Sequence, residues 1–132
     1  MNKIIKYGLI IIKNKKFLIN RKFDTKLFLI PGGKPNPGES IEDCLIREIN
    51  EEHKCTILKD TIVFFGDFED KAANEPDTIV SMKVYLGKIK GKPIPSHNIE
   101  EQKWFGISDD TSILSLIIKN KILPALVEKG LI

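Results

Sequence analysis

Residues 31–55, PGGKPNPGESIEDCLIREINEEHKC, constrain the fold more than any other stretch of this chain. Ser40 is placed to cap the N-terminus of a helix, with Asp43 three residues later in the manner of a capping box. Pro37 and Gly38 prevent the helix from beginning earlier, because both residues disfavour a helix interior. Three apolar residues share one side of this helix at about 100° per residue: Ile41, Leu45 and Ile49. The stretch therefore predicts an amphipathic helix that packs against a core.

The second half of this helix directs carboxylates toward the side that its first half uses for apolar contacts. Glu48 and Glu52 project within about 20° of the centre of the apolar stripe, and Glu51 lies at its edge. The opposite face carries residues that we expect to be solvated: Glu42, Asp43, Asn50, His53 and Lys54. Buried carboxylates are costly unless cations accompany them. Arg47 can pair with one of these glutamates, and a divalent metal ion, Mg²⁺ or Mn²⁺, best explains the others. The alternative is a helix whose last two turns project into water, where these glutamates are merely solvated.

The spacing of these residues resembles the signature of the Nudix hydrolase family, G-x5-E-x7-R-E-U-x-E-E-x-G-U, in which U is an apolar residue. The matching residues are Gly33, Glu39, Arg47, Glu48, Ile49, Glu51 and Glu52, and Cys55 supplies the last apolar position. The run Phe28-x-Ile30-Pro31-Gly32-Gly33 resembles the family's entry into this signature. Lys54 stands where the family has a glycine that ends the helix in a left-handed conformation. We therefore expect a local change in how the helix ends, without loss of a ligand.

The resemblance implies a role for each matching residue. Glu48, Glu51 and Glu52 would hold the metal, Mg²⁺ with Mn²⁺ as a substitute, and these three form the predicted catalytic centre. The carbonyl of Gly32 would complete the metal shell. Arg47 and Glu39 would not bind the metal themselves; they would orient the carboxylates that do. Glu48 could instead serve partly as the general base, and the sequence does not separate these roles.

The candidates for substrate binding and for the general base include residues outside the signature. Three are assigned to substrate binding: Arg21, Phe28 and Gly33. For Arg21, the resemblance suggests contact with substrate phosphates, and the alternative is a solvated strand end. Glu100 and Glu101 precede Trp104 in a segment that resembles a Nudix strand, although Asn98 occupies its usual acidic position. Either glutamate is a candidate for a further ligand or the general base; the alternative is that both are exposed strand residues.

Composition narrows the class of protein. The chain has 132 residues, a length that suits one domain over residues 1–132 with a core of its own. The net charge of +3 is mild, and no long block of lysine or arginine indicates a stable nucleic-acid partner. Cys44 and Cys55 lack metal-like spacing and predict reduced thiols. No segment is long enough to predict a membrane span, and we expect a cytoplasmic protein. The sequence leaves the oligomeric state open, and a homodimer is one possibility.

The rest of the chain predicts an α+β fold. Strand patterns fall at residues 7–12, 17–20, 27–30, 56–68, 78–89 and 96–105, with an exposed polar loop at 69–77 and helical periodicity at 111–129. Pro124 should kink this last helix or begin a second one. A mixed sheet sandwiched between helices follows, and it agrees with the Nudix fold that the resemblance implies.

The function implied by the resemblance is Mg²⁺-dependent hydrolysis of a nucleoside diphosphate linked to another group. Water would attack phosphorus and a nucleotide phosphate would leave. Two alternatives stay open. One is a nucleotide or metal sensor without catalysis on the same fold. The other is a weakly basic RNA-binding domain, whose binding would fall steeply with salt and ignore chelators. The sequence does not identify the substrate.

Overall fold

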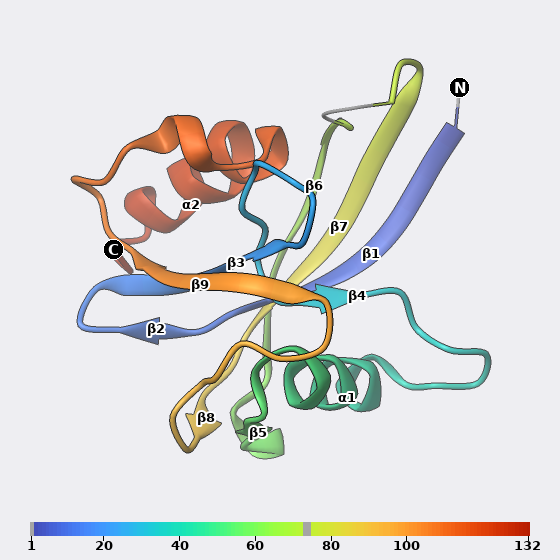
Figure 1. The fold of residues 1–132 in the computed structure, drawn as a ribbon, viewed down its shortest axis with the longest axis vertical. Helices are drawn as coiled ribbons and strands as arrows, with labels where there is room; N and C mark the ends of the chain where they lie inside the picture. The colour runs from blue at the N-terminus through green and yellow to red at the C-terminus, as the bar shows by residue number, and fades with distance from the viewer. Residues whose placement is uncertain (1, 73–74) are drawn as a thin grey trace.

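The computed structural model describes residues 2–72 and 75–132 of the chain (Figure 1). The strands are β1 (Asn2–Ile10), β2 (Ile12–Lys13), β3 (Lys16–Lys22), β4 (Gly32–Gly33), β5 (Thr56–Ile57), β6 (Val63–Lys71), β7 (Thr78–Leu86), β8 (Ile89–Lys90) and β9 (Ile99–Phe105). The α-helices are α1 (Ile41–His53) and α2 (Leu123–Glu128); a π-helical turn, Ile118–Ile122, precedes α2, and short 3-10 turns occupy Lys59–Thr61 and Thr111–Ile113.

Two sheets form the centre of the molecule. The larger has the strand order β4-β1-β7-β6, in which β1 and β7 are parallel and the other pairs are antiparallel. The second sheet has the order β2-β3-β9, and β5 pairs with β8 separately. Figure 1 shows α1 on one side of these strands and α2 on the other. The expected α+β fold, with mixed sheet between helices, is confirmed.

Alternation along β1 and β3 divides the core into two parts. Leu9 and Leu18 pack in the cluster beneath α1, together with Leu45 and Ile49 of that helix. Their neighbours in sequence point the other way, into the cluster beneath α2: Ile10, Phe17 and Ile19. Because both faces are covered, these segments read as continuous apolar runs in the sequence rather than as alternating ones.

Helix α1 begins as predicted but ends differently from the expectation. The Ser40 side chain accepts a hydrogen bond of 3.1 Å from the Asp43 N–H. At the other end Lys54 has φ 52° and ψ 36°, and its N–H bonds to the Asn50 carbonyl. Lys54 thus adopts the left-handed conformation that suits a glycine, so the expected change in the helix end was wrong. A residue with a side chain bears a cost of about 1 kcal/mol in this conformation.

Several predicted elements have other boundaries. Residues 27–30 form isolated bridges at Phe28 and Leu29 rather than a strand. Strand β6 continues to Lys71, into the predicted loop, whose residues 73–74 lie outside the described part. Pro124 falls in the first turn of α2, where its missing N–H is tolerated, directly after the π-helical turn. Cys44 and Cys55 are buried free thiols, as expected. In the described residues, no helix is long and apolar enough to span a membrane.

We expect Lys54→Gly to raise the free energy of unfolding by about 1 kcal/mol, because glycine adopts the left-handed conformation at Lys54 without steric cost. Urea denaturation of both proteins measures the change. Lys129→Gly is the matched control: Lys129 also follows a helix but has φ −84°, so glycine should give no gain there. Equal or lower stability of Lys54→Gly would contradict this prediction.

Candidate active site

The last two turns of α1 lie against the glycine turn of β4. Strand β4 pairs with β1, and the Gly32 N–H donates a hydrogen bond of 3.0 Å to Glu52 Oε1. A Cβ atom added to Gly33 would lie 2.8 Å from the Glu48 carboxyl carbon, so only glycine permits this approach. Glu52 is 4% exposed, and burial raises its pKa to about 7 although the Gly32 N–H opposes the shift.

Arg47 connects the other signature carboxylates. Its Nε and Nη2 atoms donate bonds of 2.8 and 2.9 Å to the two oxygens of Glu39. Its Nη1 atom lies 2.7 Å from Glu48 Oε1 and 3.5 Å from Glu51 Oε2. The hydrogen bonds from Arg47 and then from the Asn36 N–H hold the pKa of Glu39 at about 2. The planar guanidinium therefore fixes Glu39 and Glu48 in one arrangement, which lysine could not reproduce.

A buried polar network fixes the C-terminal end of α1. His53 is 0% exposed, in contrast to the expected solvated position. Its Nε2 atom lies 2.9 Å from Asn20 Nδ2, and its Nδ1 atom lies 2.7 Å from Gln102 Oε1. Gln102 Nε2 in turn donates to the Pro93 carbonyl. The prediction from the helical projection was wrong because it counted only the stripe of α1, whereas β3 and β9 also cover the end of this helix.

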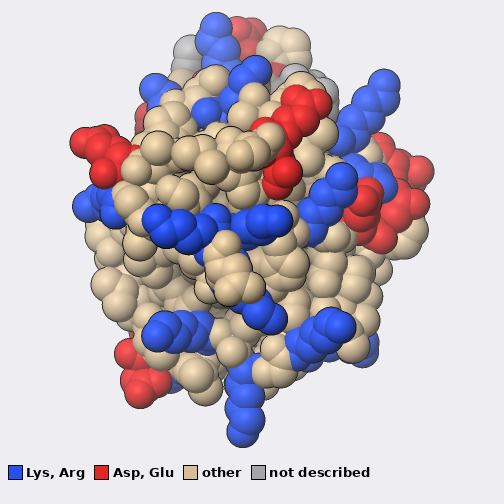
Figure 2. Space-filling view, turned by 90° about the vertical axis from the view of Figure 1, so that its left-hand side faces the viewer, with Lys and Arg blue, Asp and Glu red and all other residues tan. Residues whose placement is uncertain are grey.

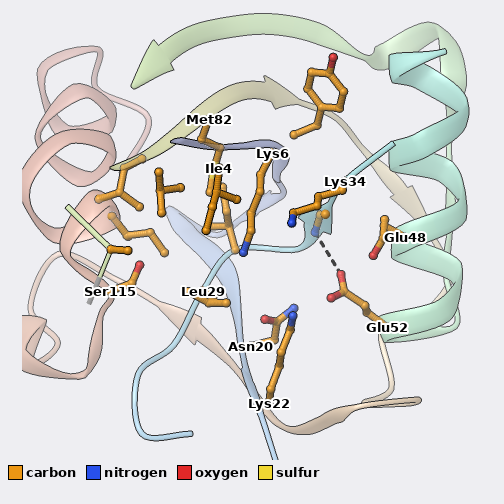
Figure 3. A pocket seen from close by; sticks show the side chains of 18 of the residues that line it. Ile4, Lys6, Asn20, Lys22, Leu29, Lys34, Glu48, Glu52, Met82 and Ser115 are labelled. Atoms are coloured by element: carbon orange, nitrogen blue, oxygen red, sulfur yellow. Dashed lines mark hydrogen bonds between the residues drawn. The ribbon is translucent and has the colours of Figure 1, made fainter. Parts of the chain in front are cut away.

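The glutamates border a cavity of about 670 Å³ between the larger sheet, α1 and the segment that precedes α2 (Figure 3). One end is polar and contains Glu48, Glu51 and Glu52 with the glycine turn. Lysines from separate segments also line the cavity: Lys6, Lys22, Lys34 and Lys71. Apolar residues also line the cavity: Ile4, Leu29, Ile30, Val80, Met82 and Ile117. Figure 3 shows Ile4, Leu29 and Met82 on the side away from Glu48 and Glu52. The cavity can therefore accommodate a ligand with a charged part and an apolar part.

Ser115 provides a hydrogen-bonding group at the apolar end. The residue is 6% exposed, and its hydroxyl is the one buried side-chain oxygen or nitrogen in the described chain without a hydrogen-bond partner. Figure 3 shows it across the cavity from Glu48 and Glu52. A buried hydroxyl without a partner costs free energy unless a ligand or water satisfies it.

The residues at the polar end fit a divalent metal by their chemistry. Across residues 2–72 and 75–132, no three His, Cys, Asp or Glu side chains already converge on a common point. Arg47 engages Glu48 and Glu51, and the Gly32 N–H engages Glu52. The donors are nevertheless all oxygens, the set that Mg²⁺ and Mn²⁺ prefer, and a cation would offset the cost of ionising the buried Glu52.

The structure brings the signature residues together and leaves the other candidates elsewhere. Glu48, Glu51, Glu52, Arg47, Gly32 and Gly33 all line the cavity. Arg21 does not line it: Arg21 pairs instead with Glu100 at 2.7 Å and Glu101 at 3.4 Å. Phe28 is buried in the core beneath α2, with the Arg21 guanidinium 5.9 Å from its ring centre. Alternation along β3 explains the difference, because Asn20 and Lys22 face the cavity and Arg21 between them does not.

The residues that sequence reasoning missed come from strands and loops rather than from the signature. Lys6 and Lys22 lie on strands whose alternate residues, Ile4 and Asn20, also line the cavity, so a period of two was the available signal. Ser115 and His53 gave no such signal, because their burial depends on segments distant in the sequence.

Comparison with known proteins assigns the class. A family model described as NUDIX domain matches residues 5–117. This match spans most of the chain, and the chain belongs to the Nudix family. It is accordingly a hydrolase of acid anhydrides in phosphorus-containing compounds, in a family that generally uses divalent metal ions and nucleotide-derived substrates. No curated protein sequence matches the chain.

Solved structures agree on the fold. The MutT Nudix hydrolase from Burkholderia pseudomallei is 21% identical, with 83% of this chain and 88% of that chain aligned and a TM-score of 0.70. The MutT protein from Methanosarcina mazei Go1 is 21% identical, with 97% and 96% aligned and a TM-score of 0.76. A Nudix hydrolase from Nitrosomonas europaea is 18% identical, with 97% and 90% aligned and a TM-score of 0.78.

We expect His53→Gln to remove a pH-dependent loss of stability. Burial lowers the pKa of His53, so below about pH 6.5 the unfolded chain takes up this proton before the folded protein does. The contribution of neutral His53 is therefore present above that pH and is lost as the pH falls. Glutamine can accept from Asn20 and donate to Gln102 without titrating. The expected difference in slope is up to about 1.4 kcal/mol per pH unit between pH 6.5 and 5.

Urea denaturation of wild type and His53→Gln at several pH values, without metal ions, measures this difference. Glu52 titrates in both proteins, so its own contribution cancels in the comparison. The control is His97→Gln, which replaces an exposed histidine and leaves the buried His53 network intact. Identical slopes for wild type and His53→Gln would contradict the prediction.

Proposed function

We propose that this protein is a Mg²⁺-dependent pyrophosphohydrolase that cleaves a nucleoside diphosphate linked to another group. The observation that carries the proposal is the placement of Glu48, Glu51 and Glu52 beside the glycine turn, at one end of a cavity whose other end is apolar. A charged end suits phosphates with their metal ion, and an apolar end suits a nucleobase. Water attacks phosphorus, the bridging P–O bond breaks, and a nucleotide phosphate is released.

Each signature residue has a distinct role in this proposal. Glu48, Glu51 and Glu52 would hold Mg²⁺, or Mn²⁺ in its place, with the carbonyl of Gly32 as a further candidate donor. When bound, the metal neutralises phosphate charge and supplies a water of lowered pKa. Arg47 fixes Glu39 and Glu48, and thereby limits the orientations that the metal-binding carboxylates can take.

The apolar end of the cavity supports a nucleotide substrate over an inorganic one. Ile4, Val80 and Met82 offer a surface against which a planar ring can pack. Ser115 offers a hydroxyl that can donate to a base carbonyl or ring nitrogen, or accept from an amino group. Bases with different polar edges are therefore the natural panel for the substrate screen, together with nucleotide sugars, ADP-ribose and dinucleoside polyphosphates.

The two alternative functions receive less support. A sensor without catalysis has little need of the complete set of carboxylates and their Arg47 partner. For RNA binding, a continuous basic surface would be expected. On the face shown in Figure 2, lysines and arginines are scattered over uncharged surface, and carboxylates lie in its upper half as well as at its margins. A panel of nucleotides that bind without turnover would favour the sensor.

We expect Glu52→Gln to lower turnover by roughly 100-fold or more, because the variant keeps an acceptor for the Gly32 N–H but loses the charge that holds the metal. Product release with saturating Mg²⁺ measures the effect, and thermal unfolding checks that the fold is intact. The control is Glu42→Gln on the same helix, away from the cavity, which should retain wild-type activity. Near wild-type hydrolysis by Glu52→Gln would contradict the proposal.

A further inference from the structure

Three lysines from separate segments meet in the polar half of the cavity. Lys6 comes from β1, Lys22 from the end of β3, and Lys34 from the residue after β4 (Figure 3). The β1–β4 register pairs Gly8 with Gly32 and Tyr7 with Gly33. Lys6 and Lys34 are the next residues along these two segments, immediately beyond the paired positions, and their charges repel each other.

These lysines have no acidic partner in the described chain. No carboxylate oxygen among residues 2–72 and 75–132 lies within 4.0 Å of the ammonium of any of the three, whereas Lys3 pairs with Glu69 at 2.8 Å and Lys83 with Asp67 at 2.9 Å. Burial lowers the pKa of Lys6, and repulsion from Lys22 and Lys34 lowers it further. The free protein therefore holds a partly buried cluster of positive charge that Glu52 and Glu75 offset only from a distance, without an ion pair.

The neighbouring glutamates form no ion pair with these lysines, although Glu52 attracts Lys6 from a distance. Arg47 engages Glu48 and Glu51, and Gly32 engages Glu52. The polar half thus has two walls with different preferences: carboxylates suited to metal ions, and lysines suited to an anion. A diphosphate bound through metal ions at the carboxylates has much of its charge compensated there. A further phosphate group carries negative charge that only the lysine wall can match.

We propose that Lys6, Lys22 and Lys34 form a subsite for a phosphate group beyond the diphosphate that is cleaved. The substrate class is then a nucleoside triphosphate or longer polyphosphate, in preference to a nucleoside diphosphate capped by an uncharged sugar. This inference rests on the proposed function. For a triphosphate, the oxygen of one water forms a new bond to phosphorus as one bridging P–O bond breaks. The products are a nucleoside monophosphate, inorganic diphosphate and a proton.

Direct binding tests the subsite without turnover. Inorganic tripolyphosphate is titrated into the whole protein in EDTA by calorimetry at several salt concentrations. We expect Lys6→Met, Lys22→Met and Lys34→Met each to weaken binding about 5-fold and to reduce its salt dependence. Lys3→Met is the matched control on the same strand as Lys6, and it should bind as wild type does. Unchanged tripolyphosphate binding in the three cavity variants would overturn the proposal.

Stability separates a ligand site from a structural role. Lys6→Met removes one of the like charges in the free protein, so its thermal midpoint should equal or exceed that of wild type while tripolyphosphate binding weakens. A lysine retained for packing or pairing would show the opposite, with a lowered midpoint and unchanged binding. That result would overturn the proposal for Lys6.

The selectivity between a nucleoside triphosphate and a nucleotide sugar gives a further test. With Mg²⁺, the ratio of kcat/KM for a nucleoside triphosphate to that for a nucleotide sugar with the same base should fall about 5-fold in each cavity variant and stay constant in Lys3→Met. An equal loss for both substrates would overturn the subsite and leave the hydrolase intact. If wild type hydrolyses neither compound nor any other in the panel, the proposed function fails, and tripolyphosphate binding alone decides the subsite.

Discussion

The contact between the glycine turn of β4 and the last turns of α1 is the constraint on which the site depends. Gly33 lets the Glu48 carboxylate approach the backbone where any side chain would clash, and the Gly32 N–H holds Glu52 in a nearly buried position. Other elements hold the two sides of this contact in place. Strand β1 fixes the turn by pairing with it, and the His53 network anchors the end of α1 to β3 and β9. A carboxylate in this position stays costly until a cation or proton accompanies it.

Several polar and charged groups that line the cavity destabilise the protein when no ligand is bound. Burial raises the pKa of Glu52. In the described residues, Lys6, Lys22 and Lys34 form no ion pair with an acidic residue, and the Ser115 hydroxyl has no hydrogen bond. Each of these features is unfavourable in the absence of a ligand, and all of them line one cavity. Elsewhere the described structure satisfies its buried groups, as in the chain of hydrogen bonds from Asn20 through His53 and Gln102 to the Pro93 carbonyl. Unsatisfied groups concentrated in one place are typical of a binding site, because the ligand supplies what the protein lacks.

Local patterns predicted those parts of the molecule in which neighbours in sequence decide the outcome. The Ser40 cap, the extent of α1 and the inward direction of Glu48 and Glu52 all follow from helical geometry over a few residues. Predictions that depended on contacts with other elements were less accurate. His53 was expected in solvent and is buried, because its covering strands are distant in sequence. Arg21 was predicted to contact substrate phosphates, but Lys22 and not Arg21 lines the cavity, because one residue of register decides the face of a strand. Lys54 adopts the left-handed conformation without glycine because the packing of α1 outweighs about 1 kcal/mol of local strain.

The sequence by itself therefore determined the family, the helix that carries the carboxylates and the α+β class, since each depends on residue types at fixed spacing. Only the tertiary structure decided what surrounds those carboxylates. Lys6, Lys22, Lys34 and Ser115 come from four segments, and no spacing relates them. They line one cavity because β1 pairs with β4 on one side and the segment before α2 closes the cavity on the other. A helix specifies its own face through a period of 3.6 residues, whereas the walls of a cavity are specified by pairing and packing between segments that are far apart along the chain.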